Sequence, residues 1–502
     1  MQEKGQSSGQ PEKLPTEKQL TEEQSIEEQP IEEQPIEKPA ADRSAMLGTM
    51  EMKRLVPKIS VPIMLSMLVQ ALYNVVDSIF ISRYDPNGLT SVSLAFPFQM
   101  LMIALGVGMG TGINSLLSRR LGEKRPDEAR RAAWNGWLIE AASALLFLLM
   151  GVFAAGALMG AVVSDNLMNA ESIRETGTVY LSIVTTWSFG LFTAVFFERL
   201  LQATGNTVLS MITQMTGAVV NIILDPIMIF GLIGFPKMGV AGAAIATVIG
   251  QWCSAGVGFL LNQKKNPELR LKLSDFAVDR NALHDIIAVG LPSAVMQAIG
   301  SVMNLGMNAI LSGFEQSNAA LNVMAVYFKL QSFIFMPVFG LGTGLIAIIG
   351  YNYGARNKER IYSCIKVALA TAIGIMLVGM FLFMVFPAQL MAIFESDAEA
   401  ALTAQMTQIG VVAMRIISTC FLPAAVGITL STVFQAVGKG TYSMLLSICR
   451  QLAVLLPAAW LIARLTNNVY AVWWSFLIAE VVSLVICLML YKKCNREMIA
   501  VL

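Results

Sequence analysis

Long runs of hydrophobic residues alternate with short polar connections from about residue 57 to the end of the chain. A helix needs about 20 mainly apolar residues to cross a lipid bilayer, and twelve of the runs reach that length. They predict membrane-spanning helices at residues 58–82, 90–117, 130–157, 176–200, 207–231, 239–262, 285–312, 319–350, 361–386, 402–432, 442–463 and 469–491. The pattern therefore predicts an all-α membrane protein with twelve transmembrane helices.

The second six helices repeat sequence motifs of the first six at an offset of 230 to 233 residues. The recurring pairs are Gly108-Met-Gly-Thr-Gly112 with Gly340-Leu-Gly-Thr-Gly344, Leu121-Gly-Glu-Lys124 with Tyr353-Gly-Ala-Arg356, Gln202-Ala-Thr-Gly205 with Gln435-Ala-Val-Gly438, and Pro62 and Asn74 with Pro292 and Asn304. Parallel repeats about an axis normal to the membrane occur in secondary transporters. We therefore expect two pseudo-symmetric six-helix bundles with a substrate cavity between them.

Composition changes sharply near residue 50. Residues 1–44 contain 11 acidic and 5 basic residues, are rich in Glu, Gln and Pro, and lack aromatic side chains. Such a segment cannot bury enough apolar surface to fold. The expected organisation is a disordered acidic tail at 1–50, an N-lobe at 51–262, a cytoplasmic inter-lobe loop at 263–284 and a C-lobe at 285–502.

Lysine and arginine are concentrated in the connections on one side of the predicted bundle. Connections 118–131, 263–284 and 353–360 are basic, whereas 387–401 contains three acidic residues and no lysine or arginine. Because short cytoplasmic loops carry an excess of basic residues, both chain termini are expected in the cytoplasm. We therefore expect a multi-pass protein of the cell membrane.

The counts of reactive residues argue against several classes of protein. His284 is the single histidine, so a Ser–His–Asp hydrolase, a His-rich zinc site and paired haem ligation are not expected. The six cysteines are scattered without CxxC spacing, and no GxxxxGKS/T phosphate loop occurs. We therefore expect neither an enzyme nor a nucleotide-driven pump, and no cofactor.

Two predicted helices of the first half carry a carboxylate within a stripe of polar side chains. The stripes are Gln70, Asn74 and Asp77 in helix 58–82, and Gln214, Asn221 and Asp225 in helix 207–231. An ionisable side chain at the centre of a membrane helix costs about 2.5–3.5 kcal/mol, so each carboxylate requires a reason. Both lie at similar distances from the outer helix ends, so we expect one shared site for a proton or a Na⁺ ion. The alternative is that each Asp caps a broken helix or binds a buried polar partner.

The chain resembles the multidrug and toxic compound extrusion (MATE) family over roughly residues 55–490. Features similar to that family are Pro62 fifteen residues before Asp77, Asn221-Ile-Ile-Leu-Asp-Pro226, Gly239-Val-Ala-Gly-Ala-Ala-Ile-Ala-Thr247 and the repeated Gln-Ala-x-Gly. The resemblance implies a cation-coupling site formed by Asp77, Asn221, Asp225 and Thr247, and a hinge in the first helix at Pro62. Some members also use acidic residues in helices 7 and 10, where this chain has Asn304, Asn308 and Arg415. Coupling is therefore expected to rest on the first lobe.

Polar and basic residues of the predicted helices outline the expected substrate cavity. They are Gln70, Asn74, Gln214, Asn304, Asn308, Lys329, Arg415 and Arg450. The three cations would give the C-lobe a basic face opposite the acidic N-lobe. The alternative is that they bind carbonyls or acids, or extend to a membrane interface.

Together these features predict a secondary active antiporter that exports cationic or amphipathic organic compounds in exchange for H⁺ or Na⁺. Its expected partners are small organic substrates and the lipid bilayer, without nucleic acid, and we expect a monomer. No metal is expected beyond Na⁺ at the four coupling residues. The alternative is a flippase for a lipid-linked precursor in the wider superfamily, because such proteins often carry a strongly basic central cavity.

Overall fold

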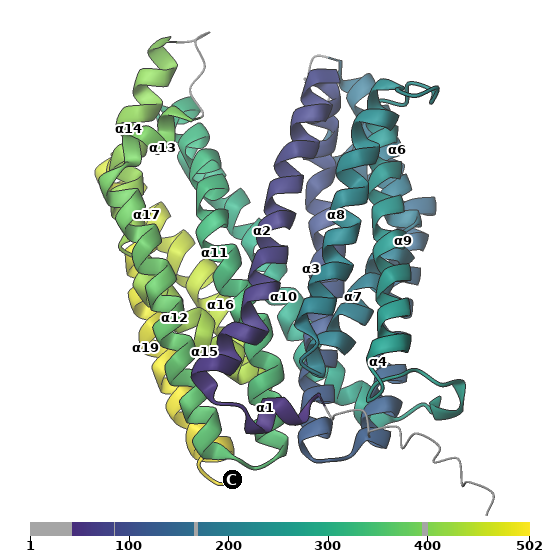
Figure 1. Ribbon diagram of the computed structural model, residues 1–502. Coiled ribbons are helices and arrows are strands. Elements are labelled where there is room, and N and C mark those ends of the chain that lie inside the picture. The colour runs from purple at the N-terminus through teal and green to yellow at the C-terminus, as the bar shows by residue number, and fades with distance from the viewer. Residues whose placement is uncertain (1–42, 85, 165–168, 394–399) are drawn as a thin grey trace, which may run out of the picture. The chain divides into compact units, whose positions relative to one another are not determined.

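The computed structural model describes residues 43–84, 86–164, 169–393 and 400–502. Within these ranges the chain is helical and contains no β-strand. The helices, shown in Figure 1, are α1 (Ala45–Thr49), α2 (Met52–Tyr84), α3 (Pro86–Gly122), α4 (Pro126–Phe153), α5 (Ala155–Val162), α6 (Ala170–Thr186), α7 (Phe189–Ala203), α8 (Thr207–Phe230), α9 (Val240–Lys265), α10 (Arg280–Leu311), α11 (Ser317–Gly354), α12 (Lys358–Val385), α13 (Pro387–Ala392), α14 (Ala400–Ser418), α15 (Phe421–Ala436), α16 (Gly440–Ile448), α17 (Leu456–Thr466), α18 (Val469–Val472) and α19 (Trp474–Cys494), with the 3₁₀ turn η1 (Leu273–Asp275) and the π-helical turns η2 (Cys449–Leu455) and η3 (Asn495–Ile499). The all-α prediction is confirmed.

Ten helical segments of the described chain are long and apolar enough to cross a membrane. Two further spans are broken helix pairs, in which α6 and α7 meet at 44° and α14 and α15 meet at 50°. With each pair counted as one span, the twelve predicted spans are present in the described ranges. The breaks at Trp187 and Thr419 are 232 residues apart, which matches the offset of the sequence repeat. The fourth and tenth spans are therefore bent at equivalent positions, which the hydrophobic pattern did not predict.

Helix ends follow local capping chemistry. α4 begins at Pro126, whose fixed φ and missing N–H suit the first turn of a helix, and two acidic residues follow in that turn. Before α10, the Asp279 side chain accepts a hydrogen bond from the Asn281 N–H at 2.9 Å. α8 ends at Phe230, and the next residue, Gly231, has a φ of 73° that glycine adopts without strain. These signals explain why the helices end close to the predicted boundaries.

Glycines of the repeated GxGTG motif lie where the two halves of the chain contact each other. α3 packs against α10, and α11 packs against α2. A Cβ atom on Gly108 would collide with the backbone of Ala294, and one on Gly340 would lie 2.8 Å from the Cα of Met64. Because Ala294 and Met64 are 230 residues apart, the repeat relates the two contacts. The two bundles are thus pseudo-symmetric, and small residues permit their close approach.

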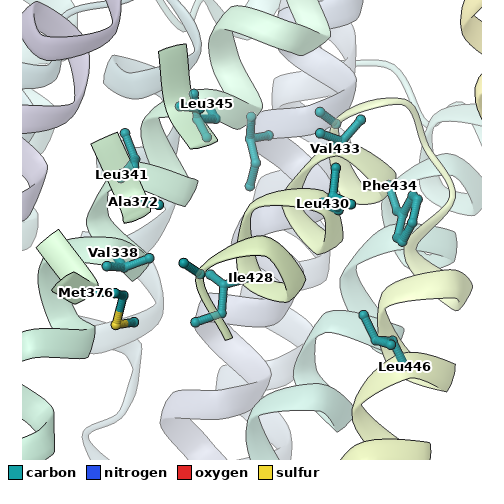
Figure 2. Packing of buried hydrophobic residues seen from close by; sticks show 14 of the residues in the cluster. Val338, Leu341, Leu345, Ala372, Met376, Ile428, Leu430, Val433, Phe434 and Leu446 are labelled. Atoms are coloured by element: carbon teal, nitrogen blue, oxygen red, sulfur yellow. The ribbon is translucent and has the colours of Figure 1, made fainter. Parts of the chain in front are cut away.

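Buried side chains form separate clusters in the described chain. A large cluster includes Val338 of α11, Met376 of α12 and Leu430 of α15, which Figure 2 shows together. A smaller cluster contains residues of the first half only, among them Phe147 and Phe192, whose rings stack 6.0 Å apart. In the second half, α15 packs against both α12 and α19. These three helices therefore form one continuous wall of the second bundle.

The last residues of the predicted acidic tail are helical. α1 buries Leu47 completely, and it is bound by residues of both halves of the chain. The bonds are Arg43 Nη1 to Asn206 Oδ1 at 2.7 Å, the Ser44 N–H to Glu268 Oε1 at 2.9 Å, Asn352 Nδ2 to the Leu47 oxygen at 3.0 Å and Arg360 Nη2 to the Met50 oxygen at 2.8 Å. Residues 43–50 of the predicted disordered tail are therefore ordered, which corrects the predicted boundary at residue 50, and residues 1–42 lie outside the described residues.

Candidate functional site

The polar stripes of α2 and α8 face each other, because these helices pack side by side. Gln214 of α8 donates from Nε2 to Gln70 Oε1 of α2 at 2.9 Å. Asp77 lies seven residues before the end of α2 at Tyr84, and Asp225 lies five residues before the end of α8 at Phe230. At about 1.5 Å per residue the two carboxylates are therefore at similar distances from the ends of their helices.

A close crossing of α8 and α9 brings the next pair of predicted residues together. A Cβ atom on Gly250 of α9 would lie 2.7 Å from the Gly217 carbonyl oxygen of α8, so only glycine allows this approach. Asn221, one turn further along α8, donates from Nδ2 to Thr247 Oγ1 of α9 and to Asp225 Oδ1, each at 3.2 Å. Three of the four predicted coupling residues thus form one hydrogen-bonded group.

The fourth residue, Asp77, reaches this group from α2. Its carboxylate interacts electrostatically with Asp225, and Asp225 is 0% exposed. Three buried oxygens accept no hydrogen bond from a described residue: Asp77 Oδ1, Asn221 Oδ1 and Asp225 Oδ2. Buried polar atoms without a partner are rare and require an explanation.

The chemistry of these oxygens selects the kind of ligand. All three are acceptors, and two belong to carboxylates, so they fit a proton or a hard cation that prefers oxygen ligands. Among the described residues, no group of three or more His, Cys, Asp or Glu side chains is arranged to hold a metal ion. Two carboxylates, one amide and one hydroxyl offer oxygen acceptors that suit a proton or a hard cation.

Two tyrosines and a glutamine that the sequence analysis did not assign surround the carboxylates. Tyr73 and Tyr180 both interact electrostatically with Asp77 and Asp225. Tyr180 of α6 donates its hydroxyl to Gln99 Oε1 of α3 at 3.2 Å. Tyr73 lies four residues before Asp77 on the same helix face, a signal that could have identified it. The positions of Tyr180 and Gln99 depend on how α3 and α6 pack, and no local pattern indicates them.

The remaining predicted cavity residues are dispersed. The side chain of Asn74 lies outside the described residues. Asn304 and Asn308 are one turn apart on α10 and partly buried, whereas Lys329 of α11 is exposed. Arg415 of α14 is also exposed, and its Nε donates to the Met384 carbonyl oxygen at 3.3 Å. Arg415 therefore binds a carbonyl, as the alternative interpretation expected.

Arg450 forms an ion pair. It lies in the π-helical turn η2, and α17 begins directly after this turn with a proline in its first turn. Its Nη1 is 3.5 Å from Glu480 Oε1 of α19, and both side chains are largely buried. The pair neutralises one of the three cations from which a basic second lobe was inferred.

Removing one partner of this pair should destabilise the second bundle. We expect Glu480→Gln to lower the free energy of unfolding by about 1–3 kcal/mol, less than the 3–5 kcal/mol of a fully buried pair because some exposure remains. The apparent melting temperature in detergent reports this loss, and exposed Lys264→Gln is the control. A double variant, Arg450→Met with Glu480→Leu, should recover most of the stability. An unchanged melting temperature in Glu480→Gln would show that the pair is not structural.

A second buried polar network lies in the first half of the chain. Glu140 of α4 is 1% exposed, and neither carboxylate oxygen accepts a hydrogen bond from a described residue. Its electrostatic partner is Arg199 of α7, which donates from Nη1 to Gln202 Oε1 at 2.7 Å. Gln202 donates in turn to Ser210 Oγ of α8 at 2.9 Å. This network joins three helices and gives Gln202, the first residue of one Gln-Ala-x-Gly motif, a partner on α8.

Two repeated six-helix bundles with a buried carboxylate pair define the class of an integral membrane transporter. The model of the MatE family matches residues 62–227 and 292–461, with one match in each repeat. The chain therefore belongs to the MatE, or multidrug and toxic compound extrusion, family of efflux transporters, and it is not an enzyme.

Individual proteins are similar over nearly the whole chain. The multidrug export protein MepA of Staphylococcus haemolyticus is 27% identical over 442 residues, which cover 87% of this chain and 93% of that protein. The probable multidrug resistance protein NorM of Thermotoga maritima is 24% identical over 86% of this chain and 90% of its own length. A solved structure described as an outward-facing multidrug resistance MATE transporter of the MOP superfamily has a TM-score of 0.82 at 25% identity, covering 91% of this chain and 99% of that one. The predicted family and twelve-helix fold are confirmed.

Proposed function

We propose that the protein is a secondary active antiporter that exports cationic or amphipathic organic compounds in exchange for H⁺ or Na⁺. The observation that carries the proposal is the buried acceptor group of Asp77, Asn221 and Asp225. The names of MepA and NorM as multidrug export and resistance proteins support the substrate class. The matches cover 93% of MepA and 90% of NorM, so this chain contains nearly the full length of these exporters.

Coupling arises from electrostatic repulsion between two buried carboxylates. When both are ionised, their proximity in a low-dielectric site is unfavourable, and a proton or Na⁺ relieves it. Asn221 and Thr247 supply the neutral oxygens of the site. Pro62 removes a backbone hydrogen bond inside α2, which makes this helix the natural place for a bend. Cation binding at Asp77 would then change the shape of α2 and of the cavity beside it.

Substrates would bind between an N-lobe at 51–262 and a C-lobe at 285–502, which move relative to each other during transport. Gln70, Gln214, Asn304 and Asn308 provide uncharged polar contacts that tolerate different organic cations. The basic connections support a cytoplasmic location for both termini, in the cell membrane. We propose a monomer that needs no nucleic acid and no cofactor.

Transport in proteoliposomes tests this function. Vesicles containing the full-length protein are loaded at low pH or with Na⁺, and a fluorescent organic cation is added outside. We expect accumulation inside under one of the two gradients, and none when a protonophore or an ionophore removes that gradient. Accumulation of the fluorescent cation that does not depend on either gradient would contradict antiport.

The flippase interpretation is less favoured because Arg450 is neutralised by Glu480. The same vesicles can carry a labelled lipid-linked pyrophosphate in one leaflet. We expect no protein-dependent movement of that lipid between leaflets. Fast movement of the lipid without export of organic cations would replace the proposed function with the flippase.

A further inference from the structure

A groove of about 380 Å³ lies on the second bundle between α12, α15 and α19. Its apolar side is formed by Leu369, Leu430 and Leu488, together with other aliphatic residues. Leu488 is 48% exposed, so the groove opens on the outer surface of the bundle. In a membrane protein that surface contacts lipid, and the ligand of such a groove arrives from the bilayer.

One end of the groove is polar. Lys366 of α12 lines it with two phenols, Tyr362 of α12 and Tyr491 of α19, and no acidic residue takes part in the lining. The Tyr362 hydroxyl donates to Asn495 Oδ1 at 2.8 Å, which fixes this end to the C-terminal turn η3. The groove therefore joins an apolar surface to a single positive charge.

α12 begins and α19 ends on the side that carries the C-terminus (Figure 1). The residues of the polar end are close in sequence to these two helix ends. Lys366 is eight residues from the start of α12 at Lys358, which corresponds to about 12 Å. Tyr491 is three residues before the end of α19 at Cys494. Tyrosine is enriched where membrane meets water, and a lysine just inside a span extends its ammonium group to that level.

The exposed ammonium group at this level attracts an anionic partner. The ion pairs found among the described residues do not include Lys366. A phospholipid of the same leaflet supplies a phosphate at the depth of the ammonium group and acyl chains at the depth of the leucines. A basic residue close to the membrane surface attracts anionic lipid by about 1 kcal/mol.

We propose that this groove binds one anionic phospholipid, with its phosphate on Lys366 and an acyl chain along Leu369, Leu430 and Leu488. An organic cation is a poor occupant because Lys366 repels it. The site is separate from the coupling residues on α2, α8 and α9, so it can be tested without transport.

Native mass spectrometry of the full-length protein in detergent tests the proposal with phosphatidylglycerol and phosphatidylcholine of equal chain length. We expect wild type to retain one phosphatidylglycerol in preference to phosphatidylcholine, and Lys366→Gln to bind it about five-fold more weakly, which corresponds to ~1 kcal/mol. Lys264→Gln, which removes an exposed charge at the end of α9, should bind as wild type does. Leu488→Trp, which keeps the charge and fills the groove, should also weaken binding.

Three results would overturn the proposal. If Lys366→Gln and Lys264→Gln weakened phosphatidylglycerol binding equally, the lipid would be attracted to general surface charge and not to the groove. Displacement of the lipid by an organic cation would make the groove a substrate site. A dimer that disappears in Leu488→Trp would make it an interface between copies of the chain.

Discussion

Asparagine in place of Asp225 should strongly reduce ion-driven efflux while the protein remains folded. The amide keeps the Oδ1 acceptor that Asn221 Nδ2 binds at 3.2 Å. It removes the negative charge on a 0% exposed side chain and with it the group that takes up the cation. Coupling free energies between sites are about 1–3 kcal/mol, or roughly 5–150-fold. We therefore expect gradient-driven transport to fall by about 10–100-fold.

The same result is expected for Asp77→Asn, because we propose that the two carboxylates share one cation. Transport in proteoliposomes under an imposed H⁺ or Na⁺ gradient measures both variants, and the melting temperature checks their folding. Glu175→Gln, an exposed carboxylate on α6, is the matched control and should transport normally. If Asp77→Asn and Asp225→Asn both retained full gradient-dependent transport, the coupling site would be elsewhere.

Alanine at Gly122 or Gly354 should destabilise the contact between the two halves of the chain. A Cβ atom on Gly122 of α3 would collide with the carbonyl oxygen of Tyr351 of α11, and one on Gly354 would collide with that of Arg119. Neither clash can be relieved by rotating a side chain, because both atoms struck belong to the backbone. The helix ends must separate, and overpacking of this kind costs typically about 1–3 kcal/mol.

Gly374→Ala on α12 is the control for this prediction. Apart from the backbone of α12 itself, no atom of a described residue lies within 4 Å of the added Cβ, so alanine should leave the melting temperature unchanged or raise it. Melting temperature and the yield of monodisperse protein in detergent measure all three variants. Since the sequence repeat relates Gly122 and Gly354, their losses should be similar. If all three alanine variants were equally stable, the ends of α3 and α11 would not be in the close contact that excludes a Cβ atom at Gly122 and Gly354.

Much of the fold could be predicted because its signals are local. A run of about 20 apolar residues must form a helix in lipid, since every backbone polar group has to be satisfied within the segment. The bends at Trp187 and Thr419 were not predicted, because the apolar run continues through both breaks. Helical spacing also placed Gln70 and Asp77 on one face, and Gln214 and Asp225 on another.

The partners of the buried charged residues could not be predicted from the sequence. Glu140 interacts electrostatically with Arg199, and Glu480 forms an ion pair with Arg450. The partners are 59 and 30 residues away in sequence, on helices whose contact no local pattern specifies. A basic second lobe was therefore inferred from residues that tertiary packing partly neutralises.

The sequence by itself determined twelve spans, their duplication and the two carboxylates within the first half. These properties follow from hydrophobicity and helical periodicity, which act along the chain. Tertiary structure alone decided that Asn221 bridges Asp225 and Thr247, and that three buried oxygens of Asp77, Asn221 and Asp225 accept no hydrogen bond from a described residue. Whether a buried acceptor has a partner depends on side chains from several helices, so only their packing can decide it.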